Sequence, residues 1–151
     1  MEHHLSNNFK YKTILHIGIG NSYFANNFYK DSKITGITIS QKEIDKAKSY
    51  NLSNYDFFLC DKYSKEFNTF TNKNKFDLVV DNNLKSYSCC QESFEFMMDN
   101  IIESMNDNGM LITSINGMKW FKKLWKKYSK WLCKDLYKIH GTQYDHFFLL
   151  L

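Results

Sequence analysis

The chain has 151 residues, of which 43% are hydrophobic and 24% charged, a size that suits one compact domain and is too small for two. Its longest apolar run is the five residues 147–151, whereas a membrane-spanning helix needs about 20. The net charge is +4, and all 20 basic residues are lysines. Because arginine is absent, the chain lacks the planar guanidinium group that binds phosphate or guanine through two parallel hydrogen bonds. This composition excludes a transmembrane protein, a secreted disulfide scaffold and a disordered tail, and the missing arginines disfavour a nucleic-acid partner.

Strand-like and helix-like segments alternate along the chain. Short apolar or β-branched runs predict seven strands, at residues 12–19, 33–40, 56–60, 76–80, 110–114, 136–140 and 146–151. Between them, apolar spacing predicts helices, at residues 22–29, 40–49, 94–105 and 118–134. The Asn- and Lys-rich stretch 67–75 is expected to be a mobile loop.

Two of these helices carry end signals. Ser40 followed by Glu43 is a capping box that opens the helix 40–49. Asn108-Gly109 is expected to end the helix 94–105 with a left-handed cap. The whole pattern predicts a single α/β domain over residues 1–151. Its doubly wound, mainly parallel seven-stranded sheet has helices on both faces and closes in a C-terminal antiparallel hairpin.

The most informative motif is His-Ile-Gly-Ile-Gly-Asn-Ser at residues 16–22, where the first strand meets the first helix. Glycine there allows a sharp turn and lets a ligand approach the backbone. In a doubly wound sheet, ligands bind beyond the carboxyl ends of the strands, where the strand order reverses. A tight turn without a ligand would also explain two glycines, so the motif alone leaves both alternatives open.

The glycine turn resembles motif I of class I S-adenosylmethionine-dependent methyltransferases. Later segments follow the order of that family: GITIS at 36–40, LCD at 59–61, FDLVVDNN at 76–83 and NDNGML at 106–111. The resemblance covers residues 10–151 and implies a minimal Rossmann-like methyltransferase with S-adenosylmethionine as cofactor. It implies a set of cofactor-binding residues: Gly18, Gly20, Asn21, Ser22, Thr38, Gln41, Glu43, Asp61, Asp81 and Asn82. Asp81 and Tyr87 are the implied catalytic residues.

Three departures from the family pattern bear on the site. His16 stands where the family usually has an acid, Ser22 replaces a third glycine, and Thr38 replaces the acid that holds the ribose hydroxyls. Gln41 or Glu43 could supply the ribose acceptor, or each could be an ordinary helix-surface residue. Asp81 could accept a proton from a substrate hydroxyl, or it could only line the methionine end of the cofactor.

The four cysteines are Cys60, Cys89, Cys90 and Cys133, and no CxxC pair exists among them. This spacing predicts reduced thiols in a cytoplasmic protein and no metal site. The helix 118–134 combines seven lysines with three tryptophans. It could present a solvated basic face, contact an anionic membrane surface, or contact nucleic-acid phosphates.

We therefore expect a methyltransferase that acts on a small molecule or on a glycan-like hydroxyl. The alternative is a degenerate, non-catalytic Rossmann-like module that binds a partner protein. Because the predicted connections are too short to build a lid, we expect a large substrate or a second chain to cover the site. That second chain could be another copy of this protein.

Overall fold

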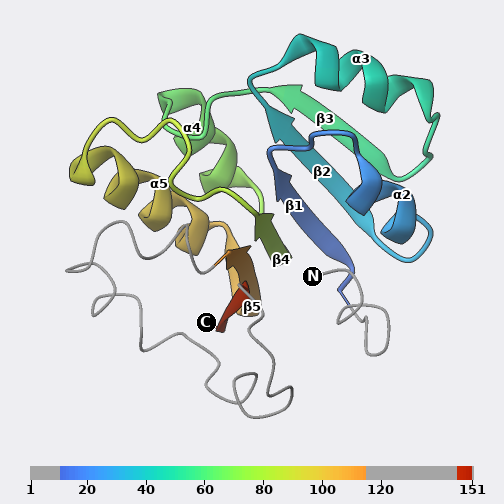
Figure 1. Ribbon diagram of the computed structural model, residues 1–151. Coiled ribbons are helices and arrows are strands. Elements are labelled where there is room, and N and C mark those ends of the chain that lie inside the picture. The colour runs from blue at the N-terminus through green and yellow to red at the C-terminus, as the bar shows by residue number, and fades with distance from the viewer. Residues whose placement is uncertain (1–10, 115–145, 151) are drawn as a thin grey trace.

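The computed structural model describes residues 11–114 and 146–150 of the chain. Within these residues, strands and helices alternate (Figure 1), as the sequence predicts except at the stretch 67–75. The strands are β1 (Thr13–Ile17), β2 (Lys33–Thr38), β3 (Tyr55–Leu59), β4 (Phe76–Asp81), β5 (Met105–Ser114) and β6 (His146–Leu150). The helices are α2 (Tyr23–Phe28), α3 (Gln41–Ser49), α4 (Lys65–Lys73) and α5 (Gln91–Glu103).

The described strands form one six-stranded sheet in the order β3-β2-β1-β4-β5-β6. The first five are parallel, and β6 pairs antiparallel with β5, with Ile112 opposite Phe148. The predicted strand 136–140, and with it the closing hairpin, lies outside the described residues, as does the predicted helix 118–134. The mainly parallel α/β sheet is thus confirmed, whereas the seventh strand stays a prediction.

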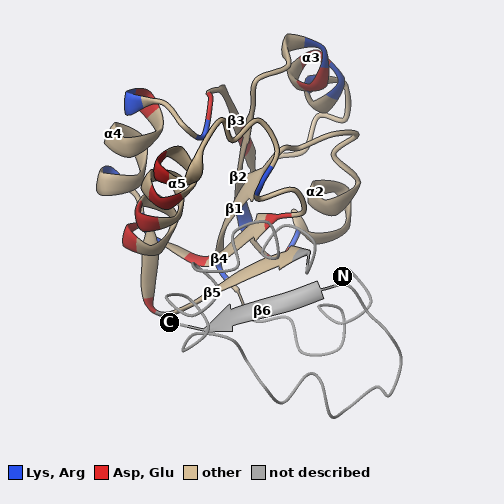
Figure 2. Cartoon of the chain, turned by 60° about the vertical axis from the view of Figure 1, so that its left-hand side comes forward, with Lys and Arg blue, Asp and Glu red and all other residues tan. Residues whose placement is uncertain are grey.

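Helices cover both faces of the sheet (Figure 2). On one face, Phe24 and Phe28 of α2 and Ile44 of α3 pack into one buried apolar cluster. On the other, Phe67 of α4 and Met97 of α5 belong to a second cluster. Both clusters include strand residues that are fully buried, because the central strands of a parallel sheet have helices above and below them.

The predicted loop 67–75 is wrong, because these residues lie mostly in helix α4. The Ser64 side chain accepts a hydrogen bond from the Phe67 N–H at 3.1 Å and begins the helix. Phe67 and Thr71, one turn apart, are both buried. The many Asn and Lys residues occupy the solvent side, so a polar composition concealed an amphipathic helix.

The predicted left-handed cap at Asn108-Gly109 is also wrong. Helix α5 ends at Glu103, and β5 already begins at Met105. The β4–β5 register shifts between Phe76 and Leu78, so β5 is irregular there. A Cβ on Gly109 would lie 2.8 Å from the Met105 Cβ. Glycine is therefore needed here because the backbone of an irregular strand comes close to Met105, and not because a helix ends.

Candidate functional site

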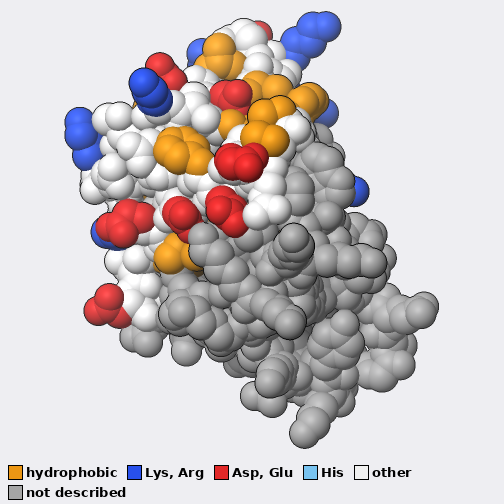
Figure 3. Space-filling model, turned by 90° about the vertical axis from the view of Figure 1, so that its left-hand side faces the viewer, with side chains coloured by type: hydrophobic (Ala, Val, Ile, Leu, Met, Phe, Trp, Pro, Cys, Tyr) orange, Lys and Arg blue, Asp and Glu red, His pale blue; other side chains and the backbone are white. Residues whose placement is uncertain are grey.

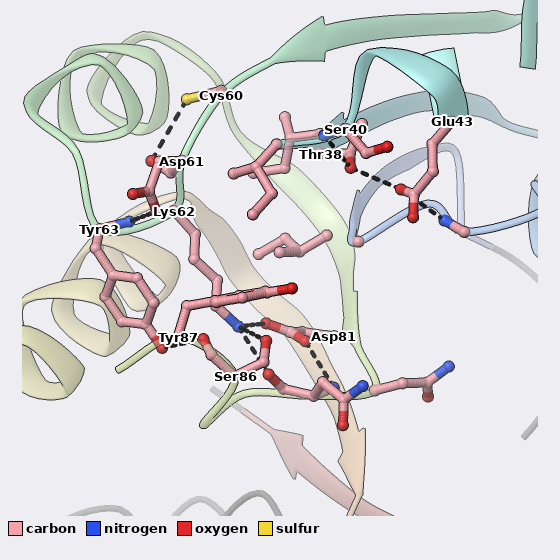
Figure 4. A pocket seen from close by; sticks show the side chains of 17 residues that line it. Thr38, Ser40, Glu43, Cys60, Asp61, Lys62, Tyr63, Asp81, Ser86 and Tyr87 are labelled. Atoms are coloured by element: carbon pink, nitrogen blue, oxygen red, sulfur yellow. Dashed lines mark hydrogen bonds and ion pairs between the residues drawn. The ribbon is translucent and has the colours of Figure 1, made fainter. Parts of the chain in front are cut away.

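A cleft of about 450 Å³ lies at the carboxyl ends of the first four strands (Figure 4). The cleft is lined by one residue at or just after the end of each of the strands β1, β2, β3 and β4: Ile17, Thr38, Cys60 and Asp81. The neighbouring central strands β1 and β4 lead to helices on opposite faces of the sheet, which is where a doubly wound fold opens a crevice. The position agrees with the site predicted from the glycine turn.

The glycine turn supplies one wall of the cleft as bare backbone. Gly18 and Gly20 both line the cleft, with φ angles of 72° and 53°. A Cβ built on either glycine would meet no atom within 4 Å. A side chain here would therefore extend into open space beside the cleft, and its absence lets a ligand reach the backbone.

Glu43 joins the glycine turn to the end of β2. Its Oε2 accepts hydrogen bonds from the Gly20 N–H at 3.1 Å and from the Thr38 hydroxyl at 2.6 Å. The predicted capping box is wrong, because the Ser40 side chain makes no cap bond and the Glu43 carboxylate turns to the cleft instead. Thr38 stands at the position of the usual strand-end acid but does not supply a carboxylate itself. Its hydroxyl orients the carboxylate of Glu43, which lies one turn into α3.

Asp61 follows β3 at the far side of the cleft. Its Oδ1 accepts a hydrogen bond from the Tyr63 N–H at 2.9 Å, which fixes the turn into α4. The residue is exposed and lines the cleft. A carboxylate oxygen here can accept a hydrogen bond from an amino group of a bound ligand.

Asp81 and Lys62 form a buried ion pair inside the cleft. The Lys62 Nζ lies 2.8 Å from Asp81 Oδ2, and the side chains are only 9% and 3% exposed. The other carboxylate oxygen, Oδ1, accepts from the Asn83 N–H at 2.8 Å. Both oxygens of Asp81 therefore already have donors, which disfavours a role as proton acceptor.

The loop between β4 and α5 forms the outer rim of the cleft. Asn82, Asn83 and Ser86 contribute polar side chains, and Tyr87 is 81% exposed with a φ of 63°. The hydroxyl of Tyr63 donates toward the carbonyl oxygens of Leu84 and Ser86, at 3.0 and 2.9 Å, and burial raises its pKa. This phenol stays protonated at neutral pH and serves as a donor to the loop.

Three predicted residues lie beside the cleft instead of lining it. Ser22 is buried, and its hydroxyl lies 3.3 Å from that of Tyr55. Asn21 accepts a hydrogen bond from the Tyr23 N–H, and Gln41 donates to Asp45 within α3. The cleft is lined by the other predicted residues: Gly18, Gly20, Thr38, Glu43, Asp61, Asp81, Asn82 and Tyr87.

Lys62 is one of the lining residues that sequence reasoning missed, together with Tyr63 and Ser86. It reaches Asp81 and the carbonyl oxygens of Asn83 and Leu84, which lie 19 to 22 positions further along the chain. A lysine after a strand-end aspartate resembles any solvated residue in the sequence. No local pattern marks it, because its partners come together only in the folded sheet.

Two other features are absent from the described residues. No group of three or more His, Cys, Asp and Glu side chains among them is arranged to hold a metal ion. Likewise, none of the described helices combines the length and apolar character needed to cross a membrane.

Comparison with known proteins agrees with this geometry. The model of a family described as a methyltransferase domain matches residues 8–148. The chain therefore belongs to the methyltransferase domain family, as its resemblance to class I S-adenosylmethionine-dependent methyltransferases predicts. No curated protein matches the chain.

Solved structures show the same fold at low sequence identity. The N-methyltransferase NodS from Bradyrhizobium japonicum WM9 superposes with a TM-score of 0.69 at 16% identity, over 97% of this chain and 88% of that one. Its complex with S-adenosyl-l-homocysteine gives 0.69 at 15% identity, over 97% and 80%. A DhpI–SAH complex gives 0.60 at 17% identity, over 74% of this chain and 52% of that one.

Proposed function

We propose that the cleft binds S-adenosylmethionine and that the protein transfers its methyl group to a small molecule or a glycan-like hydroxyl. Methyl transfer needs little from the protein, because the cofactor's sulfonium is already activated and mainly has to be aligned with the acceptor. The residues at the four strand ends suit such a cofactor. They offer bare backbone, hydrogen-bond acceptors and a rim open to an acceptor molecule.

The observation that carries this proposal is the placement of Glu43. Two donors hold one of its oxygens, Oε2, in the cleft, and no described residue donates to Oε1. The free oxygen is thereby available to a ribose hydroxyl at the end of β2. Asp61 would accept from the adenine amino group at the end of β3, and Gly18 and Gly20 would lie against the methionine part.

The rim of the cleft supports the choice of acceptor. Asn82, Asn83 and Ser86 can hydrogen-bond to hydroxyl groups, and the exposed Tyr87 ring offers an apolar face of the kind that packs against a sugar ring. We assign Tyr87 to the acceptor side. Asp81, with both oxygens engaged, is assigned to the methionine end of the cofactor instead of to proton removal.

Cofactor binding by the Gly20→Val variant tests the proposal. We expect wild-type protein to bind S-adenosylmethionine in titration calorimetry. The valine side chain would enter the space beside the cleft and abolish binding, while the far-UV circular dichroism spectrum stays near wild type. Binding within about twofold of wild type would remove the site assignment. Wild-type protein that fails to bind at millimolar cofactor would favour the non-catalytic alternative.

A further inference from the structure

Lys62 makes the densest set of polar contacts in the cleft. Its Nζ donates to Asp81 Oδ2 at 2.8 Å, to the Asn83 carbonyl at 2.8 Å and to the Leu84 carbonyl at 3.0 Å. The Ser86 hydroxyl lies 3.4 Å away. Figure 4 shows the side chain extending from the turn after β3 toward Asp81 at the end of β4. Lys62 therefore connects two walls of the cleft.

Because Lys62 and Asp81 are buried, each charge depends on the other for stabilisation. Lys62 and Asp81 are each less than a tenth exposed, so either charge alone would be poorly solvated. Three ammonium hydrogens face one carboxylate and two carbonyl oxygens, which satisfies the lysine. The pair is thus held in one geometry, and its two charges compensate each other within the cleft.

The neighbouring residue reinforces the same connection. Tyr63 directs its hydroxyl to the carbonyl oxygens of Leu84 and Ser86. Two consecutive residues of the β3–α4 turn therefore hold the backbone of the loop that carries Tyr87. The loop in question, residues 82–88, is the part of the rim that we assign to the acceptor.

We propose that Lys62 is a positioning residue of the methyl-transfer site. It fixes the 82–88 loop and cancels the charge of Asp81, and so limits how strongly the cleft prefers the positively charged cofactor over its neutral product. This inference rests on the proposed function. It concerns Lys62 alone, whose role the family resemblance does not specify.

The charge argument follows from the chemistry of methyl transfer. The sulfur–methyl bond breaks with its electron pair left on sulfur, the acceptor's lone pair forms the new bond to carbon, and the acceptor's proton passes to water. S-adenosylmethionine thus carries a sulfonium charge that S-adenosylhomocysteine lacks. An uncompensated Asp81 would favour the charged form, and an uncompensated Lys62 would favour the neutral one.

Titration calorimetry with both compounds tests this on four variants. For Lys62→Met we expect the affinity ratio of S-adenosylmethionine to S-adenosylhomocysteine to rise about tenfold, and for Asp81→Asn to fall about tenfold. The double variant, which carries neither charge, should return within about threefold of the wild-type ratio. Lys65→Met is the matched control, because Lys65 is exposed on the first turn of α4 and should leave the ratio unchanged.

Hydrogen exchange of the double variant provides a second measurement, which can be made even if one of the single variants folds poorly. The double variant has no unpaired buried charge, yet it lacks the ammonium group that holds the Asn83 carbonyl and that shares the Leu84 carbonyl with Tyr63. Amides of residues 82–88 should exchange at least about tenfold faster than in wild type, while amides of β1 keep their wild-type protection.

The outcomes separate this inference from the proposed function. Equal weakening of both compounds by Lys62→Met, with an unchanged ratio, would make Lys62 a scaffold residue and overturn the inference. Unchanged exchange of residues 82–88 in the double variant would also overturn it. Wild-type protein that binds neither compound would instead refute the proposed function, and this inference would fall with it.

Discussion

His16 is a buried histidine at the end of the central strand β1. It is 5% exposed, and its Nδ1 has no hydrogen-bond partner among the described residues. The ring packs against Phe24, with ring centroids 5.0 Å apart. Because burial disfavours the charged imidazolium, the pKa of His16 falls from 6.5 to about 4.

This pKa predicts an acid-sensitive fold. Between about pH 6.5 and 4 the unfolded chain binds a proton at His16 that the folded chain does not, so the free energy of unfolding falls as pH decreases through this window. A shift of this size corresponds to a loss of up to about 3 kcal/mol. His16→Leu should remove this part of the pH dependence.

Urea unfolding of wild type and His16→Leu at several pH values between 4 and 7 measures the effect. Other groups titrate equally in both proteins, so the difference between the two curves isolates His16. The leucine variant should match or exceed wild type at pH 7, since it removes a polar atom without a described partner. Parallel curves for the two proteins would contradict the buried neutral histidine.

Asp61 supports a prediction about cofactor affinity. If its carboxylate accepts from the adenine amino group, Asp61→Ala should weaken S-adenosylmethionine binding by roughly 1.5–3 kcal/mol, or about tenfold to a hundredfold. Asp56→Ala is the control, because Asp56 is also on the β3 side but pairs with the exposed Lys33 at 3.6 Å. Equal affinities for wild type and Asp61→Ala would leave Asp61 as a turn residue only.

At the residue scale, the sequence predicts those site members that follow a strand directly. The glycine turn is predicted in this way, because parallel strands bring their carboxyl ends to one edge, whereas Asp61 and Asp81 are implied by the resemblance to the methyltransferase family. Glu43 was found with its cleft role left open, since a glutamate three residues after a serine also fits a capping box. Only the folded positions of Thr38 and Gly20 decide between these roles.

Two serines at helix starts make a matched pair at the scale of the element. Ser64 caps α4 with a side-chain hydrogen bond to the Phe67 N–H, whereas Ser40 begins α3 without a side-chain cap bond. Ser64→Ala should therefore lower the free energy of unfolding by about 1 kcal/mol, and Ser40→Ala by only a few tenths. Urea denaturation of both variants measures this, and equal losses would contradict the assigned caps.

The order of strands and helices was largely predictable, because apolar periodicity can be recognised in the sequence without knowledge of tertiary contacts. The loop at 67–75 and the helix cap at Asn108-Gly109 were predicted wrongly, because the first prediction used composition and the second used a dipeptide instead of apolar periodicity. In α4 only Phe67 and Thr71 are buried, which is too weak an apolar signal against four Asn and Lys residues. Gly109 resembles a helix end, but the constraint on it comes from Met105, four residues away in the same strand.

At the scale of the whole molecule, the cleft remains open along the rim formed by the β4–α5 loop. Large apolar side chains are exposed around its edge: Ile39 at 54%, Leu59 at 57% and Tyr87 at 81%. Figure 3 shows hydrophobic side chains on the face that carries α4 and α5, some of them adjoining near the upper edge and others standing singly. Exposed apolar groups of this kind mark interaction surfaces when they adjoin one another.

Sheet topology indicates where a second chain would meet this surface. β3 lies at one end of the described sheet and pairs only with β2 there, so its other side offers free backbone groups. Phe58 and Leu59 are exposed on this strand, and Ile39 follows its neighbour β2. A second copy of the chain along β3 would cover these side chains and lie beside the Asp61 end of the cleft.

We therefore predict self-association through β3. Size exclusion coupled to light scattering at micromolar protein should give about twice the 18.1 kDa mass of one chain. Leu59→Glu should shift the mass toward a single chain, because it places a charge in the apolar contact. Tyr23→Glu is the control: Tyr23 is similarly exposed at 56% but lies on α2, and its substitution should leave the mass unchanged. A single-chain mass for wild type at all concentrations would refute the prediction and leave the acceptor to close the cleft.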